Sequence, residues 1–279
     1  MILLLGGHGM LGTALARRLG HEVVAPRHTE LDVLDADALV AAARGASLVV
    51  NAAAYTNVDA AEDAPDAAFA INAVGAGNAA AAAAAAGARF AHVSTDYVFD
   101  GRSSQPYPED APHSPLGVYG ASKAEGETAV LARHPGAWIV RTAWLYGGGL
   151  GFPRAILARA AELSAIDVVD DQFGQPTWTQ DVADLIATLV AHDATPGILH
   201  ATNAGRTSWY GFARAIFEEL GLDPERVRPT DSASFARKAP RPANSTLGHD
   251  GWAARGLDAP RDWRSALRAA VAAGEVRAA

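Results

Sequence analysis

The chain of 279 residues contains no cysteine. This absence excludes a disulfide framework, an iron–sulfur cluster, a thiol nucleophile and a zinc site with cysteine ligands. Positive charge is also scarce, because 23 Lys and Arg face 31 Asp and Glu, which gives a formal net charge of −8. This acidic balance argues against a nucleic acid as the partner. It still permits a phosphorylated small molecule, which backbone amides and one or two arginines can bind.

Long hydrophobic runs are lacking too. The stretch of lowest polarity, Ala73–Ala88, is mostly alanine and is interrupted by glycines and one asparagine. Alanine buries too little surface to hold a bilayer span, so we expect a helix of a soluble protein here. Met1–Leu5 is apolar but has no basic segment before it and is followed at once by glycines, unlike a secretory signal peptide. We therefore expect a cytoplasmic protein that binds no membrane.

Hydrophobic residues nevertheless make up 49% of the chain, and charged residues only 19%. This composition excludes wholesale disorder. The length permits one large domain or two unequal lobes.

Short apolar runs alternate with helical stretches over the first 145 residues. The runs lack polar alternation, which is typical of strands buried on both faces of a parallel sheet. The expected strands are Ile2–Leu5, Glu22–Ala25, Ser47–Asn51, Phe90–Ser94 and Ala137–Arg141, and the expected helices are Met10–Leu19, Ala36–Ala43, the alanine stretch and Ser122–Ala132. This order predicts an α/β fold with a Rossmann-type, doubly wound parallel sheet over residues 1–145.

The pattern changes after Trp144. A glycine-rich segment, Gly147–Gly151, is followed by a helix near Pro153–Leu163 and a polar loop at Asp170–Thr177. We expect residues 146–279 to form mainly a smaller C-terminal lobe for the substrate, and the helix at Asp181–Ala191 to return to the large sheet. From Pro196 onward, the alternation is lost.

Three glycines follow the first strand directly. Gly6, Gly9 and Gly12 form the pattern G-x-x-G-x-x-G at the start of the first helix. The first glycine permits a tight turn, the second lets the backbone approach a pyrophosphate, and the third brings helix and sheet close together. The motif predicts that residues 1–145 bind NAD(P). The alternative is a glycine-rich turn without a ligand.

The end of the second strand bears on the choice of dinucleotide. An acidic residue there would bond a ribose 2′-hydroxyl, but this chain has Arg27 and His28, with no acid until Glu30. A guanidinium can pair with a 2′-phosphate, which favours NADPH, while NADH remains an alternative. Arg27 is equally compatible with an ordinary surface residue. Asp32 and Val33, in the following loop, are candidate adenine contacts.

A tyrosine and a lysine lie four residues apart near the start of a predicted helix, so Tyr119 and Lys123 share one face. A lysine ammonium would favour the phenolate and lower the tyrosine pKa toward neutrality. Thr95 lies where a buried strand ends, the edge at which open α/β sheets bind ligands. Its hydroxyl can bond a substrate carbonyl. The alternative for Ser94 and Thr95 is capping of local backbone groups.

Together these motifs resemble the extended short-chain dehydrogenase/reductase family, and within it the dTDP-4-dehydrorhamnose reductases. The similarity covers nearly the whole chain. The strings that carry it are Asn51-Ala-Ala-Ala-Tyr-Thr56, Ser94-Thr-Asp-Tyr-Val-Phe-Asp-Gly101, Pro115-Leu-Gly-Val-Tyr-Gly-Ala-Ser-Lys123, Arg141-Thr-Ala-Trp-Leu-Tyr146, Asp170-Asp-Gln-Phe-Gly-Gln-Pro-Thr177, Ser208-Trp-Tyr210 and Arg241-Pro-Ala-Asn-Ser245.

The resemblance implies an oxidoreductase of dTDP-rhamnose biosynthesis that transfers hydride from NAD(P)H to C4 of dTDP-4-dehydro-β-L-rhamnose. It implies that Tyr119 is the proton donor, Lys123 its electrostatic partner and Thr95 the group that polarises the carbonyl. The implied cofactor contacts are Gly9, Met10, Leu11, Asp32, Val33, Ala52, Ala53 and Ala54. The implied substrate contacts are Thr95, Asp96, Tyr97, Trp144 and, at the diphosphate, Arg241.

The chain departs from the family pattern at two places. Gly117 stands where the family usually has asparagine, two residues before the tyrosine. Some relatives have a glutamate in the first helix that helps bind magnesium between subunits, but Thr13, Ala14 and Leu15 offer no carboxylate here. We expect no magnesium or other metal, and a monomer or weak homodimer.

Two alternative functions remain open. One is a 4-ketoreductase that makes another dTDP-deoxysugar. The other is a non-catalytic, cofactor-binding regulatory subunit, which would be expected to have lost part of the set formed by Thr95, Tyr119 and Lys123.

The Arg27→Ala variant tests the cofactor preference. We expect it to weaken NADPH binding more than NADH binding, because only NADPH carries the 2′-phosphate. Dissociation constants of both nucleotides, measured by fluorescence titration, check this. An equal loss for both would rule out a contact between Arg27 and the 2′-phosphate.

Overall fold

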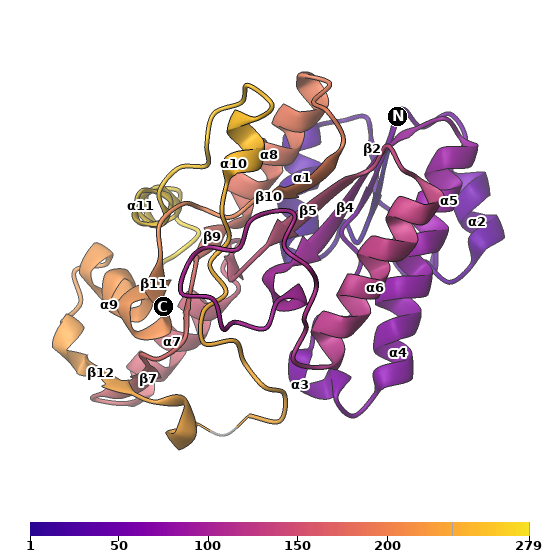
Figure 1. Ribbon diagram of the computed structural model, residues 1–279. Helices are drawn as coiled ribbons and strands as arrows, with labels where there is room; N and C mark the ends of the chain where they lie inside the picture. Colours follow the sequence, from indigo (N-terminus) through magenta and orange to yellow (C-terminus); the bar gives the residue numbers. More distant parts are fainter. Residues whose placement is uncertain (236, 279) are drawn as a thin grey trace.

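A six-stranded parallel sheet forms the centre of the computed structural model, which describes residues 1–235 and 237–278 (Figure 1). The strand order is β10-β5-β4-β3-β1-β2. The bounds are β1 Ile2–Leu5, β2 Val23–Val24, β3 Leu48–Asn51, β4 Arg89–Thr95, β5 Trp138–Thr142 and β10 Gly197–His200. The predicted α/β fold with a doubly wound sheet is confirmed. From the central pair β1 and β3, the chain adds β2 on one side and β4, β5 and β10 in turn on the other.

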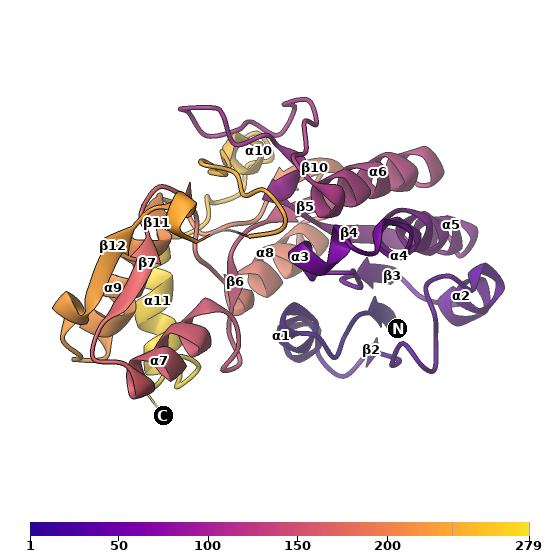
Figure 2. The same ribbon diagram turned by 90° about the horizontal axis from the view of Figure 1, so that it is seen from below.

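Helices cover both faces of this sheet (Figure 2). One face carries α2 (Ala36–Ala43), α3 (Val58–Ala61), α4 (Pro65–Phe69), the π-helix η1 (Ala70–Gly75), α5 (Ala76–Ala85) and α6 (Val118–Arg133), and the other carries α1 (Met10–Leu19), α8 (Thr179–Ala191) and α10 (Asp250–Ala253). Successive strand residues alternate between the two layers: Leu3 and Leu5 pack toward α2 and α5, and Leu4 packs toward α1 and α8. Burial on both faces explains why the strands are mostly apolar; their polar residues gather in β4 (Arg89–Thr95) and near the carboxyl ends of β3, β5 and β10.

The alanine-rich segment is a core helix of the first layer. By length and composition, Pro65–Ala85 could span a membrane, with a mean hydropathy of 1.3. Of its most apolar 18-residue stretch, 56% is buried inside the protein, where α5 packs against α2 and α6. Small alanine side chains allow this close helix packing.

The edge strand β10 is the element that the sequence pattern did not reveal. The alternation of strands and helices predicted from the sequence ends at Pro196, yet Gly197–His200 pairs in parallel with β5. This strand has only four residues and begins with a positive-φ glycine, Gly197, so its hydrophobic periodicity is weak. Trp252 of α10, far along the chain, is fully buried beside it and donates to the carbonyl of His200.

A second, smaller core lies beyond the carboxyl ends of the strands. It joins α7 (Phe152–Glu162), α9 (Trp209–Glu219) and α11 (Trp263–Ala272) with the parallel pair β7 (Ile166–Val169) and β12 (Val227–Thr230). Its buried centre includes Tyr146, Ile156 and Phe212. The short pairs β6 (Leu145–Tyr146) with β9 (Thr177–Trp178), and β8 (Phe173–Gly174) with β11 (Thr207–Ser208), lie in the same half of the chain, as do the 3-10 turns η3 (Pro224–Arg226) and η4 (Ser232–Ser234). A further 3-10 turn, η2 (Asp96–Val98), follows β4 and packs against α6.

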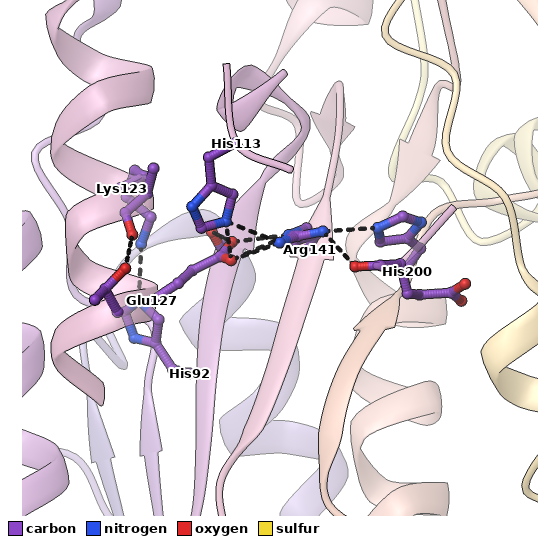
Figure 3. A network of polar contacts seen from close by, with 10 residues as sticks. His92, His113, Lys123, Glu127, Arg141 and His200 are labelled. Atoms are coloured by element: carbon purple, nitrogen blue, oxygen red, sulfur yellow. Dashed lines mark hydrogen bonds and ion pairs between the residues drawn. The ribbon is translucent and has the colours of Figure 1, made fainter. Parts of the chain in front are cut away.

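A buried ion pair fastens α6 to the sheet (Figure 3). Arg141 of β5 donates through Nε and Nη2 to the two carboxylate oxygens of Glu127, at 2.9 and 2.7 Å, and both side chains are 1% exposed. Ser94 Oγ of β4 donates to Glu127 at 2.5 Å, and His113 Nε2 lies 2.8 Å from the same carboxylate. Although burial acts to raise it, these partners lower the pKa of Glu127 to about 2.

Removing one member of this pair should be costly. We expect Arg141→Met to lower the free energy of unfolding by about 3–5 kcal/mol, because it leaves the Glu127 carboxylate buried without its cation. The double variant Arg141→Met/Glu127→Leu should recover most of that loss, since both charges are then removed. Urea unfolding at pH 7 measures the free energy of unfolding of each variant. A double variant no more stable than Arg141→Met would show that the loss does not come from the unpaired Glu127 carboxylate.

Candidate active site

The glycine loop forms a tight cradle against the segment that follows β3. Gly6 has a φ of 77°, and a Cβ there would lie 2.6 Å from the backbone of Ala52 and Ala53. A Cβ on Gly12 would lie 2.1 Å from the carbonyl oxygen of Gly6. Only glycine permits these approaches, which bring the N-terminus of α1 and residues 52–54 together at one edge of the sheet.

The other predicted cofactor residues lie around this edge with different exposures. Met10 opens α1 at the cradle, whereas the side chain of Leu11 is buried in the core under α1. Arg27 is exposed after β2, and its backbone N–H donates to Glu30 Oε2 at 2.7 Å. Asp32 is exposed, but Val33 packs in the core beside Gly75, so the backbone of Val33 is the part left for a ligand.

Polar side chains meet at the carboxyl end of β4. Thr95 Oγ1 accepts from the N–H of Tyr97 at 3.2 Å and donates to Asp96 Oδ1 at 3.0 Å. Thr95 therefore caps the turn η2 as an acceptor, and its single hydrogen is donated to Asp96, so a donation to a substrate requires the hydroxyl to turn away from Asp96. Asp96 is 1% exposed, and its Oδ2 has no hydrogen-bond partner of good geometry among the described residues. Burial raises the pKa of Asp96 to about 6, although the hydroxyls of Ser245 and Thr95 partly offset the shift.

Tyr119 reaches the same place from the first turn of α6. Its ring packs edge-on against Tyr97, with the ring centroids 5.6 Å apart. Burial raises the pKa of Tyr119 to about 12, and Asp96 adds to the shift, whereas a hydrogen bond with Thr95 opposes it. Lys123 is not among the groups that shift this pKa, so the lowering expected from it is not seen, and the phenol is protonated at neutral pH.

Lys123 is directed into the sheet rather than toward the phenol. Its Nζ donates to the carbonyl of Val93 at 2.6 Å and lies 3.2 Å from His92 Nε2 (Figure 3). Burial lowers the pKa of Lys123 to about 8, with Glu127 partly opposing the shift. His92 is fully buried, and its Nδ1 lies 3.2 Å from Asn51 Nδ2. Burial and the neighbouring Lys123 hold the pKa of His92 well below its usual value, so this imidazole is neutral.

The start of α6 explains how Gly117 is tolerated. The helix begins at Val118, four residues earlier than expected, and Gly117 is its N-cap. Glu62 Oε1, from the turn after α3, accepts the N–H of Val118 at 2.8 Å. A Cβ at Gly117 would lie 2.5 Å from that oxygen. A carboxylate from another segment thus caps the helix that carries Tyr119 and Lys123.

Trp144 joins the two cores. It has a φ of 45°, which is unusual for a residue with a side chain, and its indole packs against the backbone of Gly174. The ring stacks on Trp209 with a centroid distance of 3.5 Å and an angle of 7°. The ring of Phe152 packs against Trp209, with the two ring centroids 4.7 Å apart.

A cavity of about 350 Å³ opens beside this aromatic cluster. It lies between Tyr97, in the turn η2 after β4, and residues of the smaller core. Its aromatic lining is Tyr97, Phe152, Trp209 and Phe235, and its charged lining is Arg159, Asp167, Arg237 and Arg241. The structure therefore brings Arg241 and Tyr97 together at one cavity, with cations and aromatic rings facing the same space.

Comparison with known proteins matches this architecture over the full length. The family model described as RmlD substrate binding domain matches residues 1–276. The chain belongs to this family.

Named members of the RmlD family are similar to this chain throughout. A probable dTDP-4,6-dihydroxy-2-methyloxan-3-one 4-ketoreductase of Streptomyces antibioticus is 49% identical, with 96% of this chain and 93% of that protein aligned. A dTDP-4-dehydrorhamnose reductase of Mycolicibacterium smegmatis is 47% identical, over 98% and 85%. The crystal structure of a dTDP-4-dehydrorhamnose reductase from Bacillus anthracis in complex with NADP superposes with a TM-score of 0.93, at 32% identity and 98% coverage of both chains. The resemblance to dTDP-4-dehydrorhamnose reductases is thereby confirmed.

Several residues of this RmlD-family site carry no signal in the sequence. His92 lies inside an apolar run that predicts a buried strand, and only its place three residues before Thr95 links it to the site. Trp209 lies in one of the strings that carry the resemblance, but no pattern gives it a role in the site, and no motif includes Arg237. The last two reach the cavity only because the smaller core folds back over the sheet.

Because the carboxylate of Asp96 is buried, replacing it with an amide should stabilise the protein, by an amount that depends on pH. Its pKa in the folded protein, about 6, exceeds the value near 3.9 of an unfolded chain, so ionisation opposes folding between these values and above them. We expect Asp96→Asn to raise the free energy of unfolding by about 2–3 kcal/mol at pH 8. The gain should vanish near pH 4, where Asp96 is neutral as well.

Urea unfolding of both proteins at pH 4 and pH 8 checks this. Glu127→Gln serves as a control of opposite sign, because the pKa of Glu127 is lowered and its ionised form stabilises the fold above about pH 4.5. A difference between Asp96→Asn and the original chain that is independent of pH would contradict the prediction.

Proposed function

We propose that this protein is an NADPH-dependent reductase that converts the C4 ketone of dTDP-4-dehydro-β-L-rhamnose to the alcohol of dTDP-β-L-rhamnose. The observation that carries the proposal is the convergence of Thr95, Tyr119 and the glycine cradle at the carboxyl edge of one parallel sheet. The names of similar RmlD-family proteins, which act on dTDP-4-keto sugars, support the substrate class.

The side chains fit the roles of proton donor and carbonyl-binding group. Bound NADPH supplies the hydride to C4. The Thr95 hydroxyl donates to Asp96 in the structure, and by turning its single hydrogen to the ketone oxygen it can polarise the carbonyl. The Tyr119 phenol can release its proton to the alkoxide that forms there. The high pKa of Tyr119 keeps the phenol protonated before reaction, as a proton donor requires. Lys123, held at the end of β4 by Val93 and His92, contributes positive charge beside the cofactor ribose when protonated.

The cradle supports a dinucleotide. Gly6 and Gly12 let the loop pack tightly on its own backbone, whereas a Cβ on Gly9 would meet only the carbonyl oxygen of Gly6, at 3.4 Å. The space beside Gly9 therefore allows a pyrophosphate to approach the N-terminus of α1. Arg27 is exposed after β2, where its guanidinium could pair with the 2′-phosphate of NADPH, a group that NADH lacks. This position therefore supports NADPH over NADH. Met10, with the backbone of Leu11, Asp32 and Val33, and residues Ala52, Ala53 and Ala54 would line the rest of this site.

The cavity supports a nucleotide sugar. Arg241 would meet the diphosphate, while Asp96, Tyr97 and Trp144 would contact the sugar. Trp209 and Phe152 offer flat apolar surfaces to a pyrimidine base. We further propose a cytoplasmic protein with no nucleic acid or membrane partner, present as a monomer or weak homodimer without magnesium, because Thr13, Ala14 and Leu15 carry no carboxylate.

A second candidate substrate is another dTDP-4-keto deoxysugar. The 49% identity to a probable 4-ketoreductase of a different sugar in Streptomyces antibioticus favours it. A dTDP-4-keto-6-deoxy-D-glucose reductase of Streptomyces niveus is 44% identical over 95% of this chain. The regulatory-subunit alternative has less support, because Thr95, Tyr119 and Lys123 are all present.

A panel of dTDP-4-keto sugars tests the proposal. We expect the loss of NADPH absorbance at 340 nm to depend on the rhamnose precursor, and NMR of the product to show the new C4 alcohol. Reduction of another keto sugar only would favour the second candidate. Absence of oxidation with every member would favour the non-catalytic alternative.

The Tyr119→Phe variant is the matched control for this assay. It should keep the fold and NADPH affinity but lower kcat by about 10²–10⁴-fold, because only the proton donor is lost. Turnover within twofold of the original would show that another group protonates the alkoxide.

A further inference from the structure

A short segment of the C-terminal lobe crosses to the N-terminal half near the proposed substrate cavity. We call residues 237–241 the strap. In Figure 1 the orange chain that follows β12 runs toward α3. Two of its arginines, Arg237 and Arg241, line the cavity. Ala239, between them, is 2% exposed and so is anchored within the protein.

One carboxylate of α3 holds three groups of the strap. Asp59 Oδ1 accepts the backbone N–H of Ala239 at 3.1 Å. Asp59 Oδ2 accepts from Arg241 Nη2 at 3.0 Å and lies 3.9 Å from Arg237 Nη1. Although burial acts to raise it, these partners hold the pKa of Asp59 below its usual value. The carboxylate is therefore ionised at every pH at which the protein would work.

The side chain of Arg241 is held at both terminal nitrogens. Nη1 donates to the carbonyl of Ala239 at 2.9 Å, while Nη2 donates to Asp59. The guanidinium also lies 5.9 Å from the ring centroid of Tyr97. A guanidinium has five N–H donors, so donors remain for a ligand after these two contacts. Ordering this long side chain before a ligand arrives removes much of the rotamer entropy that binding would otherwise cost.

The charge around the cavity fits an anion with two phosphates. Arg159, Arg237 and Arg241 line it, against the single acid Asp167. Asp59 contacts both strap arginines but is not among the described residues that line the cavity. Its carboxylate can therefore orient these cations without being part of the lining that would face the anion.

We propose that Asp59 is a positioning residue for the substrate diphosphate, which it serves by holding Arg237, Arg241 and the backbone between them in a binding geometry. The inference rests on the proposed function, because the diphosphate belongs to the dTDP-sugar. It makes Asp59, a residue of the cofactor-binding half, a determinant of affinity for the substrate.

The Asp59→Asn variant of the full chain tests this, with Asp63→Asn as the matched control. Asp63 belongs to the same surface and pairs with Lys238 of the strap, but it touches neither arginine. Isothermal titration calorimetry measures dTDP binding, and ligand-observed NMR measures thymidine, which has the same base and sugar without phosphate. We expect Asp59→Asn to weaken dTDP about tenfold, the effect of about 1.4 kcal/mol, and to change thymidine affinity less than twofold.

Steady-state kinetics give a second readout. Asp59→Asn should raise KM for the dTDP-sugar about tenfold while kcat at saturation and NADPH affinity stay within twofold, because only ground-state binding of the diphosphate is altered. Asp63→Asn should leave dTDP affinity unchanged. Should Asp59→Asn lower the thermal midpoint markedly, Asp59→Ser provides the same test with a smaller side chain.

Three results would overturn the inference. Unchanged dTDP affinity would show that the arginines need no support from Asp59, and tighter binding would show that Asp59 competes with the diphosphate. Equal weakening of dTDP and thymidine would also overturn it, because the defect would then not be at the phosphates. If the original chain itself binds no dTDP, the proposed function fails too, which separates the two cases.

Discussion

The geometry of the site depends on the buried pair of Glu127 and Arg141. This pair, with Ser94, joins α6 to β4 and β5 at a point covered from solvent. Tyr119 and Lys123 precede Glu127 on α6, and Thr95 follows Ser94 on β4. Because a bidentate pair fixes both distance and orientation, it fixes how α6 lies on the sheet. The phenol and the hydroxyl meet only while that registry is kept.

Burial acts to raise the pKa of both buried carboxylates of this region, and their partners decide the outcome. Glu127, with a cation and two further donors, has a lowered pKa, whereas Asp96, with one carboxylate oxygen unpartnered among the described residues, has a raised one. The first carboxylate stabilises the fold, and the second lowers stability at a place where a ligand can supply the missing donor. Such a division is typical of functional sites, which retain polar groups that the fold alone does not satisfy.

The substrate side of the site is assembled from distant segments. The cavity takes Tyr97 from the turn after β4, Trp209 from α9 and Arg241 from the strap. The stacked Trp144 and Trp209 connect the two cores, and Asp59 connects the strap to α3. The same sheet edge thus supports the proposed cofactor site on one side and the proposed sugar nucleotide site on the other, as is general for open α/β sheets.

Sequence alone determined the parallel sheet, the glycine cradle and the shared face of Tyr119 and Lys123. Each depends on a local property, namely a buried apolar run, a turn that needs glycine or a spacing of four in a helix. Tertiary structure decided the edge strand β10, the upward shift of the Tyr119 pKa, the contact of Lys123 with His92, and the hold of Asp59 on Arg241. The last of these contacts joins residues 182 positions apart, and burial is a property of the whole fold. No local pattern in the sequence records this contact or the burial of these groups.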